Sequence, residues 1–347
     1  MKIVHVIWSL NIGGAETLLA NLANEQALLG ETVTIIIINN CYDNEILNSI
    51  SKNVNIVLLN RRPGSKSPIP ILKLNYILFR LKPQIIHTHV GSIIDYISKS
   101  LHHKCVLTMH TTGIVTATKS LKKYARIFAI SNSVKAVLSE KFNIKSTTIT
   151  NGVVFNKILC REESNSNDCF KIVNIGRLVD NIKGQSTLIK AISIIPSELN
   201  ITVDIIGDGP DMQMLRDLSK ELNVENRVNL LGAKSQQYLH NHIKYYDLLV
   251  QPSFIEGFGL TIVEGMAAKL PVLVSDIDGT SEVVCNGKYG TIFKVGNHVD
   301  LAEKIIDIMN KRNYLKEVVD MAYTYAEKEY SLAQTAHKYI KNYELLD

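Results

Sequence analysis

The chain alternates short apolar runs with segments of helical periodicity. In the first half, we expect strands at residues 3–10, 32–38, 54–59, 84–89, 105–110 and 127–130, and helices at residues 15–29, 71–81 and 131–142. Residues 32–38 are strongly β-branched, which is typical of a central strand. Continuous apolar strands separated by helices predict a parallel sheet that is covered on both faces.

The same alternation starts again after residues 160–168, a polar segment without periodicity that we expect to be a linker. The expected strands are residues 171–175, 201–206, 228–231, 248–251 and 272–275, and the expected helices are residues 184–194, 211–222, 235–246, 260–269, 298–310 and 314–346. This repetition predicts an α/β protein with two Rossmann-like units in tandem, residues 1–160 and 161–329.

Composition narrows the class of protein. A chain of 347 residues with 46% hydrophobic residues can form two packed cores, so wholesale disorder is excluded. The five cysteines include no C-x-x-C pair, which argues against a disulfide scaffold or a structural zinc site and favours a reducing compartment. Apolar runs stay well below the ~18 residues of a spanning helix, and the apolar N-terminus is too short for a signal peptide. We therefore expect a cytoplasmic protein.

The net charge of +5 conceals an asymmetry. Residues 1–160 hold 18 Lys and Arg against 7 Asp and Glu, a net charge of +11, whereas residues 161–347 hold 20 against 26, a net charge of −6. A basic half predicts a partner such as an anionic membrane surface, a phosphorylated substrate or a nucleic acid. No nucleic acid is expected, because aromatic residues do not interleave with the cations and no binding motif occurs.

Residues 71–82 form a basic amphipathic segment with two interpretations. The helix packs on the core and presents a charged outer face, or it lies on an anionic membrane. A second basic cluster, at Lys119, Lys122, Lys123 and Arg126, increases the weight of the membrane hypothesis.

Several glycine and cation motifs follow expected strands. Gly13 and Gly14 open a helix and form either a tight turn or a phosphate site at a helix N-terminus. Arg177 ends a strand and Lys183 opens the next helix, so we expect both at the carboxyl edge of the sheet, where they form either a phosphate clamp or a pair of solvated cations. Residues 207–210 form a turn or a close approach to a nucleotide. The dinucleotide pattern G-x-G-x-x-G is absent, which argues against a dehydrogenase.

Residues 251–284 are the most informative stretch. Glu256 precedes a flexible glycine turn at residues 257–259, and Glu264 lies in the helix that follows. Carboxylates accept hydrogen bonds from sugar or ribose hydroxyls, while a helix N-terminus holds phosphate. The preference of acids for helix N-termini explains Glu264 alone. It does not explain the combination of Glu264 with Glu256 and the glycine turn.

Three histidines lie at expected strand ends of the first half, namely His87, His89 and His110. A metal would need three or four converging ligands, and no matching cysteine or carboxylate cluster accompanies these rings. We therefore expect no metal site.

Taken in order, these motifs resemble glycosyltransferase family 4, whose members have the GT-B architecture of two Rossmann-like domains with parallel sheets facing a cleft. The resemblance covers nearly the whole chain, and its most specific part is Glu256 followed eight positions later by Glu264. It also implies that a final helix, about residues 330–347, packs back on the first domain. The other matching segments are residues 13–16, 86–89, 151–153, 176–177, 183–184, 207–210 and 231–232.

The resemblance implies a retaining, metal-independent transfer of a sugar from a nucleoside-diphosphate sugar, without a cofactor. Arg177 and Lys183 match the pair that neutralises the diphosphate, and Glu256 matches the acid that contacts the sugar hydroxyls. Glu264 matches the acid that holds the ribose, and His110 matches a histidine near the donor sugar. The remaining donor-binding positions are Gly14, Gly209, Phe258, Gly259 and Leu260.

Two departures from the family pattern bear on these assignments. Arg177 and Lys183 are six positions apart where five is frequent, and Thr111 follows His110 where Asp, Asn or Gly is usual. The implied acceptor is a glycan or a polyprenyl-linked glycan of bacterial surface-polysaccharide synthesis, reached from the cytoplasmic face of the membrane. The alternatives are a nucleotide-sugar epimerase of the same fold and a non-catalytic subunit that binds a nucleotide sugar or a glycan.

Overall fold

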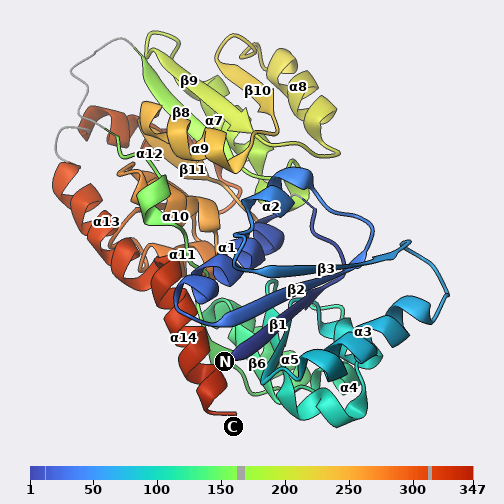
Figure 1. Cartoon of the computed structure of the whole chain (residues 1–347). Helices are drawn as coiled ribbons and strands as arrows, with labels where there is room; N and C mark the ends of the chain where they lie inside the picture. The colour runs from blue at the N-terminus through green and yellow to red at the C-terminus, as the bar shows by residue number, and fades with distance from the viewer. Residues whose placement is uncertain (12, 162–168, 312–314, 347) are drawn as a thin grey trace. The chain divides into compact units, whose positions relative to one another are not determined.

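The computed structural model describes residues 1–11, 13–161, 169–311 and 315–346, and in it the chain forms two compact units (Figure 1). The first unit combines Met1–Gly152 with the C-terminal segment that starts at Leu332, and the second unit is Val153–Ser331. Each unit is built around its own parallel sheet.

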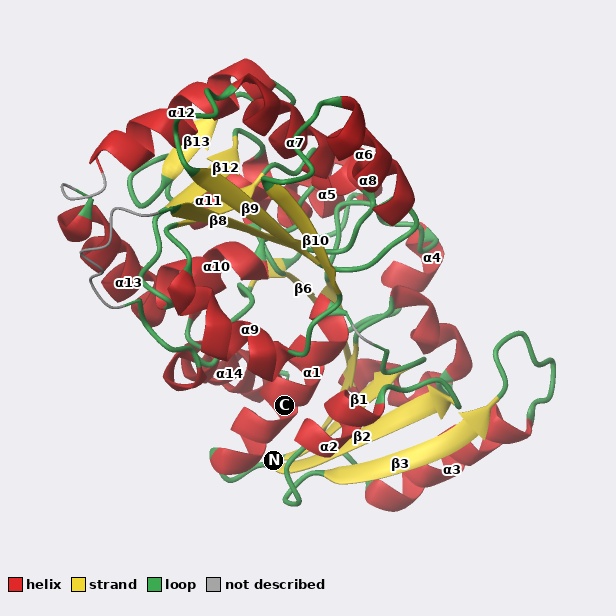
Figure 2. Cartoon of the chain, turned by 90° about the horizontal axis from the view of Figure 1, so that it is seen from above, coloured by secondary structure: helices red, strands yellow, loops and turns green. Residues whose placement is uncertain are grey.

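The sheet of the first unit has the strand order β3-β2-β1-β4-β5-β6-β7, and every neighbouring pair is parallel. Figure 2 shows β1, β2 and β3 side by side in this sheet. The strands are β1 Lys2–Ile7, β2 Thr32–Asn39, β3 Asn55–Arg61, β4 Ile85–Thr88, β5 Cys105–Met109, β6 Arg126–Ala129 and β7 Thr147–Thr148. The helices are α1 Gly14–Leu28, α2 Asn44–Ser49, α3 Ile69–Leu81, α4 Thr118–Leu121, α5 Asn132–Phe142 and α14 Leu332–Glu344, with 3₁₀ turns η1 Gly91–Tyr96 and η2 Lys99–Lys104.

The β-branched strand β2 is an interior strand next to the edge strand β3 rather than the middle of the sheet, and both of its faces are buried. Its residues from Val33 to Asn39 are all buried, and Val33, Ile35 and Ile37 pack in one cluster with apolar residues of α1. The chain leaves β1 toward β2 on one side, and β4 lies on the other side. This reversal between β1 and β4 is the switch point at which open α/β sheets bind ligands.

The second unit repeats this order as β10-β9-β8-β11-β12-β13, again with parallel pairs, so its switch point lies between β8 and β11. Its strands are β8 Phe170–Ile175, β9 Ile201–Ile206, β10 Val228–Gly232, β11 Leu248–Gln251, β12 Val272–Ser275 and β13 Thr291–Phe293. Its helices are α6 Asp180–Lys183, α7 Gln185–Ile194, α8 Met212–Glu221, α9 Gln236–His242, α10 Leu260–Ala267, α11 Asp278–Val283, α12 His298–Lys311 and α13 Lys316–Tyr330, with 3₁₀ turns η3 Phe155–Lys157 and η4 Ile243–Tyr245.

The C-terminal region differs from the single helix expected over residues 314–346. Two helices, α13 and α14, are separated by Ser331, whose backbone is extended (φ −68°, ψ 143°). Ser331 forms a bridge with Val153, and the Val153 N–H donates to the carbonyl oxygen of Tyr330 at 2.9 Å. This pairing with a distant segment interrupts the helix, and α14 packs against α1 in the first unit. Tyr314 lies outside the described residues.

The division between the units falls at Gly152 rather than at the expected residue 160. Residues 153–161 already bond within the second unit, since Leu159 donates to His240 and Arg161 donates to Ala268 through backbone N–H groups. The rest of the expected linker, residues 162–168, lies outside the described residues.

Candidate active site

The switch point of the second unit brings two predicted site segments together. Gly176 and Arg177 follow β8, while the loop at residues 252–259 follows β11. Strands β8 and β11 are parallel neighbours, so their carboxyl ends lie at the same edge of the sheet. The candidate site therefore lies where a ligand of an open α/β sheet is expected.

The loop between Arg177 and Lys183 contacts the segment that follows β11. The intervening residues form the short helix α6, and the carbonyl oxygen of Ile182 accepts the N–H groups of Phe254 and Ile255 at 2.8 and 3.0 Å. Gly184 follows in the left-handed region (φ +67°), and a β-carbon there would collide with the carbonyl oxygen of Pro252. The loop between Arg177 and Lys183 thus holds the segment that leads to Glu256 through backbone hydrogen bonds.

Lys183 and Glu256 form an ion pair, with Nζ and Oε2 separated by 2.6 Å. Their side chains retain 22% and 13% of their exposure, so the pair is accessible from solvent. Arg177, by contrast, is exposed, and none of the described residues forms an ion pair or hydrogen bond with its guanidinium. The segments that follow β8 and β11 thus offer a guanidinium that is unpaired among the described residues and a lysine–carboxylate pair at one edge of the sheet, which suits an anionic group that carries hydroxyls.

The turn at residues 207–210 needs its glycines for packing. A β-carbon on Gly207 would collide with the backbone of Gly176, and one on Gly209 would collide with the backbone of Leu178. The Leu178 N–H also donates to the carbonyl oxygen of Asp208 at 2.9 Å. This close packing explains the glycine at position 209, and contact of Gly209 with a nucleotide stays a prediction.

Phe258 and Gly259 in the glycine turn before α10 are both buried. Gly259 has φ +88° and is the N-cap of α10, which begins at Leu260. The side chain of Phe258 is only 2% exposed and packs edge-to-face on Tyr330 with ring centroids 5.3 Å apart. Any ligand contact of residues 258–260 is therefore made by the unsatisfied N–H groups at the helix start.

The carboxyl of Glu264 is largely removed from solvent, and few favourable interactions offset the loss of its hydration. Burial raises its pKa from 4.5 to about 7, and a hydrogen bond with Gln236 opposes this rise only in part. Nε2 of His240 lies 3.9 Å from its Oε1, but burial lowers the pKa of His240 to about 4, so that ring is neutral at physiological pH. A carboxyl retained in such surroundings at a strand-edge site is typical of a functional group.

The burial of the Glu264 carboxyl predicts that its ionisation destabilises the folded chain at higher pH. The folded chain holds the Glu264 proton more tightly than the unfolded chain does, so the free energy of unfolding falls as pH rises from 4.5 to about 7. Glu264→Gln should therefore unfold at a higher temperature than wild type at about pH 8 and at nearly the same temperature at about pH 5. Calorimetry at both pH values checks this, with the exposed Glu225→Gln as control. Equal melting temperatures at the higher pH would contradict it.

The two predicted residues of the first unit lie near its own switch point. Gly14 begins α1, and the Glu16 carboxylate folds back so closely that a β-carbon on Gly13 would collide with it. Burial raises the pKa of Glu16, although a hydrogen bond with its own backbone lowers it. His110 follows β5 and is partly exposed, with its Nε2 3.1 Å from Nδ1 of His89. The other predicted site residues all belong to the second unit.

Three histidines, His5, His87 and His89, form the group of described residues that best matches a metal site, with ring nitrogens within 4.8 Å of one another. All six of their ring nitrogens already have hydrogen-bond partners, which include Thr108 and Tyr343. A metal would have to displace these bonds, so the cluster fits a hydrogen-bonded core better than a ligand set. The sequence did not indicate that His5 belongs to this histidine cluster, because the pairing of His5 with His87 depends on strand register.

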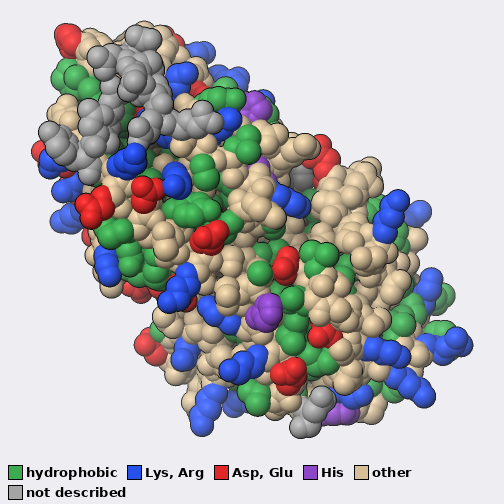
Figure 3. Space-filling view, turned by 60° about the vertical axis from the view of Figure 1, so that its left-hand side comes forward, with side chains coloured by type: hydrophobic (Ala, Val, Ile, Leu, Met, Phe, Trp, Pro, Cys, Tyr) green, Lys and Arg blue, Asp and Glu red, His purple; other side chains and the backbone are tan. Residues whose placement is uncertain are grey.

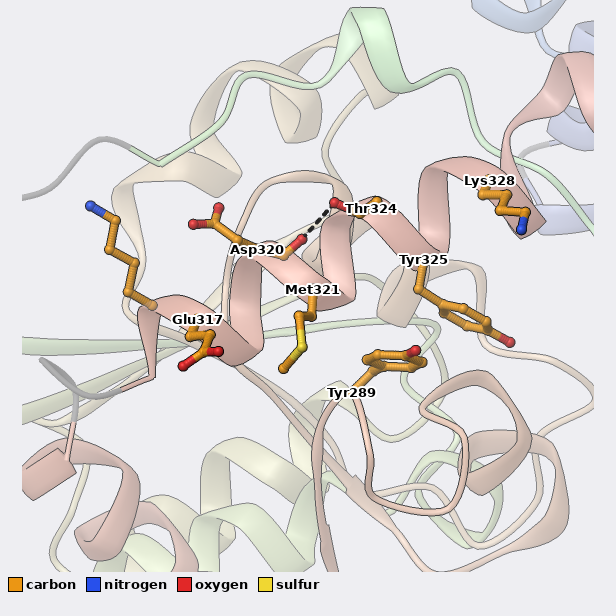
Figure 4. Close-up of a pocket in the computed structure, with 8 residues that line it drawn as sticks. Tyr289, Glu317, Asp320, Met321, Thr324, Tyr325 and Lys328 are labelled. Atoms are coloured by element: carbon orange, nitrogen blue, oxygen red, sulfur yellow. Dashed lines mark hydrogen bonds between the residues drawn. The ribbon is translucent and has the colours of Figure 1, made fainter.

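An open depression of about 850 Å³ lies along α13 (Figure 4). The rings of Tyr289 and Tyr325 stack there with centroids 4.4 Å apart. Its lining also includes Glu317, Asp320 and Lys328, and none of the predicted donor-binding residues belongs to it. The depression is therefore separate from the candidate site.

Two family models match consecutive parts of the chain. The model described as Glycosyltransferase Family 4 matches residues 12–157, and the model described as Glycosyl transferases group 1 matches residues 157–326. The chain belongs to glycosyltransferase family 4. It is therefore an enzyme that transfers a glycosyl group. This assignment argues against both alternatives raised by the sequence, the epimerase and the non-catalytic subunit.

Curated relatives support this family-4 assignment. The chain is 29% identical over 258 residues to the uncharacterized glycosyltransferase MJ1178 of Methanocaldococcus jannaschii, covering 70% of each chain. It is 27% identical over 312 residues to the capsular polysaccharide biosynthesis glycosyltransferase CapM of Staphylococcus aureus, covering 80% of this chain and 79% of CapM. The family-4 enzyme is thus related to glycosyltransferases of capsule synthesis.

Solved structures confirm the fold of this glycosyltransferase. A glycosyltransferase from Rickettsia africae matches with a TM-score of 0.83 at 22% identity, over 99% of this chain and 98% of that one. Anabaena HepE, solved in complex with UDP and glucose, matches with a TM-score of 0.81 at 18% identity, over 99% of both chains. The predicted fold class, two Rossmann-like units of the GT-B type, is confirmed.

Proposed function

We propose that this glycosyltransferase moves a sugar from a nucleoside-diphosphate sugar, with retention of anomeric configuration and without a metal, to a glycan or lipid-linked acceptor of bacterial surface-polysaccharide synthesis. The observation that carries the proposal is the set of charged side chains at the carboxyl edge of the second sheet. There Arg177, whose guanidinium is exposed, follows β8, and the loop after the neighbouring strand β11 carries Glu256, which pairs with Lys183 at 2.6 Å. Cations for a diphosphate and a carboxylate for hydroxyls are thus combined at one switch point.

The proposed chemistry needs no enzymic nucleophile. The bond between the anomeric carbon and the diphosphate oxygen breaks as the acceptor oxygen attacks from the same face, and the acceptor proton passes to the departing diphosphate. Arg177, Lys183 and the N-terminus of α10 stabilise the negative charge that develops on the leaving group, a part that a metal ion plays elsewhere. Glu256 orients the donor sugar through its hydroxyls, and Glu264 holds the ribose.

The names of relatives support the substrate classes. HepE was solved with UDP and glucose, and CapM is named for capsular polysaccharide biosynthesis. We infer by analogy that the donor is a nucleotide sugar and that the acceptor belongs to a surface polysaccharide. We place the reaction in the cytoplasm, where nucleotide sugars are made. Among the described residues, no helix is long and apolar enough to cross a membrane.

A donor panel tests this proposal. Purified full-length enzyme is incubated with a set of nucleoside-diphosphate sugars and a lipid-linked acceptor, and released nucleoside diphosphate and glycosylated lipid are both measured. We expect one donor to give both products, with the same rate in excess EDTA. A changed sugar without acceptor product would support the epimerase alternative, binding without turnover would support the non-catalytic subunit, and inhibition by EDTA would contradict the metal-free mechanism.

We further propose that α3 places the first unit on an anionic membrane surface. Large apolar side chains share its outer face and are 50–70% exposed, namely Ile69, Leu72, Tyr76 and Phe79. The cations Lys73, Arg80 and Lys82 are exposed on the same segment. Figure 3 shows Lys and Arg side chains that gather at the lower right-hand edge of the view. Apolar groups with flanking cations suit an anionic lipid surface.

The second basic cluster contributes less than the sequence indicates. Lys123 pairs with Asp95 at 2.6 Å, and Arg126 donates to the carbonyl oxygen of Asn342 at 2.9 Å. Two of its four cations are thus used inside the unit, so α3 is the main candidate for membrane contact.

Vesicle sedimentation tests the α3 surface. Because each apolar side chain contributes about 1–2 kcal/mol on burial, the double variant Leu72→Gln, Phe79→Gln should bind phosphatidylcholine vesicles containing phosphatidylglycerol at least about tenfold more weakly than wild type. The control is Val115→Gln, which removes an apolar side chain that is 98% exposed elsewhere in the unit. Equal binding of the double variant and wild type would refute the surface.

A further inference from the structure

Four polar side chains of the first unit form one continuous row of hydrogen bonds that ends at His110. Gln26 Oε1 lies 2.7 Å from Nε2 of His5, Nδ1 of His5 lies 3.1 Å from Nε2 of His89, and Nδ1 of His89 lies 3.1 Å from Nε2 of His110. Gln26 and His5 are fully buried, His89 is 7% exposed, and His110 is partly exposed. The row thus leads from the core to the predicted site histidine.

The rings in this row are neutral at physiological pH. Burial lowers the pKa of His5 and of His110 to about 4. Burial also lowers the pKa of His89 well below its usual value, and the neighbouring histidines add to this effect. A neutral imidazole carries one N–H donor and one lone pair. Each ring must therefore donate in the same direction along the row.

The direction of the row follows from its buried end. The carbonyl oxygen of Gln26 can only accept, so His5 donates from Nε2, His89 donates from Nε2 to His5, and His110 donates from Nε2 to His89. Among the described residues, no hydrogen-bond partner lies at Nδ1 of His110, which keeps a lone pair.

The other end of the Gln26 amide fits this direction. Its nitrogen makes no hydrogen bond within the described part of the chain. Burial raises the pKa of Tyr343 well above its usual value, and the Gln26 side chain opposes that rise, so the two side chains are neighbours. The amide oxygen then faces His5. A turned amide would reverse every ring and leave an N–H at Nδ1 of His110.

We propose that Gln26, His5 and His89 are positioning residues that hold His110 in its Nε2–H tautomer, so that Nδ1 accepts a hydrogen bond from a substrate hydroxyl. The assignment of that hydroxyl to the donor sugar rests on the proposed function, whereas the tautomer itself does not. An acceptor nitrogen recognises a hydroxyl and not an alkylated oxygen, so the row makes this position selective for a free hydroxyl.

His87 provides a matched control for this row. It is fully buried and faces His5 in the strand register between β1 and β4. Its ring contacts those of His5 and His89, with centroids 5.1 and 4.4 Å away. Its nitrogens, however, bond Thr108 and Tyr343 rather than the row. Replacing His87 thus disturbs the same core without interrupting the row.

The test is a long-range ¹H–¹⁵N spectrum of the full chain labelled with ¹⁵N-histidine, recorded at about pH 7 without substrate. His110→Gln identifies the His110 signals. In wild type we expect a protonated Nε2 and an unprotonated Nδ1 at His110. In His5→Phe we expect shifts averaged over both tautomers, and in His87→Phe we expect the wild-type pattern. If His5→Phe does not fold, Gln26→Leu removes the acceptor at the start of the row and should give the same averaging.

Three spectra would overturn the proposal: an N–H at Nδ1 of His110 in wild type, averaged shifts in wild type, or a His110 pattern that the row variants leave unchanged. An equal change in His87→Phe would also overturn it. With the active donor, the KM of the folded row variant should rise about fivefold to tenfold while kcat changes less, as for the loss of one oriented hydrogen bond. An intact tautomer in a chain that transfers no sugar would count against the proposed function alone.

Discussion

Arg177→Ala should lower kcat/KM for the nucleotide sugar about 100-fold to 1000-fold, the usual effect of removing one group that stabilises transition-state charge. The guanidinium is exposed beside the carboxyl end of β8, and the described residues offer it no ion-pair partner. On the proposed function its negative partner is the diphosphate of the donor, which gains charge as the sugar departs, so we expect kcat to fall as well as affinity. The fold should be unchanged because no buried group loses a partner. Steady-state release of nucleoside diphosphate and thermal unfolding together check this result.

Two companion variants separate charge from geometry. Arg177→Lys keeps the charge but loses the planar fork, so its activity should lie between those of wild type and the alanine variant. Arg216→Ala removes an equally exposed arginine from α8 in the same unit and should be nearly neutral. An Arg177→Ala enzyme within about threefold of wild type would contradict the assignment of Arg177 to the diphosphate.

Glu256→Gln should lower kcat at least about 100-fold with little effect on stability. The substitution keeps the shape of the side chain but removes the negative charge that holds Nζ of Lys183 at 2.6 Å. On the proposed function, the same charge strengthens the hydrogen bonds that the side chain accepts from the sugar hydroxyls. Because the pair is partly solvated, its loss should change the free energy of unfolding by only about 0–1 kcal/mol. Transfer kinetics and denaturant unfolding measure the two effects on the same sample.

The Lys183 partner makes this prediction sharper. Lys183→Ala should be similarly impaired, and the double variant should lose much less than the product of the two single losses, because the two side chains act as one unit. Glu225→Gln, an exposed carboxylate of the same unit, is the matched control. Full transfer activity in Glu256→Gln, or multiplicative losses in the double variant, would contradict a shared role.

The sequence alone was sufficient to predict most of the buried strands and the repetition of a Rossmann-like unit. Strands at residues 201–206, 248–251 and 272–275 were predicted with the bounds that the structure shows, because their apolar runs are short and bounded by polar residues, glycine or proline. The two-residue β7 and the three-residue β13 were missed, since so short a segment becomes a strand only through its neighbour in the sheet. The break at Ser331 was missed for the same reason, because a distant bridge to Val153 causes it.

The candidate site was predictable as a set of residues but not as a set of contacts. Motif order selected Arg177, Lys183, Glu256 and Glu264, but it gave no sign that Lys183 and Glu256 pair with each other. Nor did it indicate the row behind His110, whose members come from α1, β1 and the ends of β4 and β5. The sequence indicated that His87 and His89 lie at a strand end, but the register that brings His5 beside them is a tertiary property.

The most direct test of the central claim is the anomeric configuration of the first product formed in excess EDTA. With the active donor from the panel, ¹H NMR of the early reaction shows the coupling constant of the new anomeric proton. We predict that an α-linked nucleotide sugar gives an α-linked product at the metal-replete rate. A β-linked product, or no product until a divalent metal is restored, would contradict a metal-free retaining transfer by Arg177, Lys183 and Glu256.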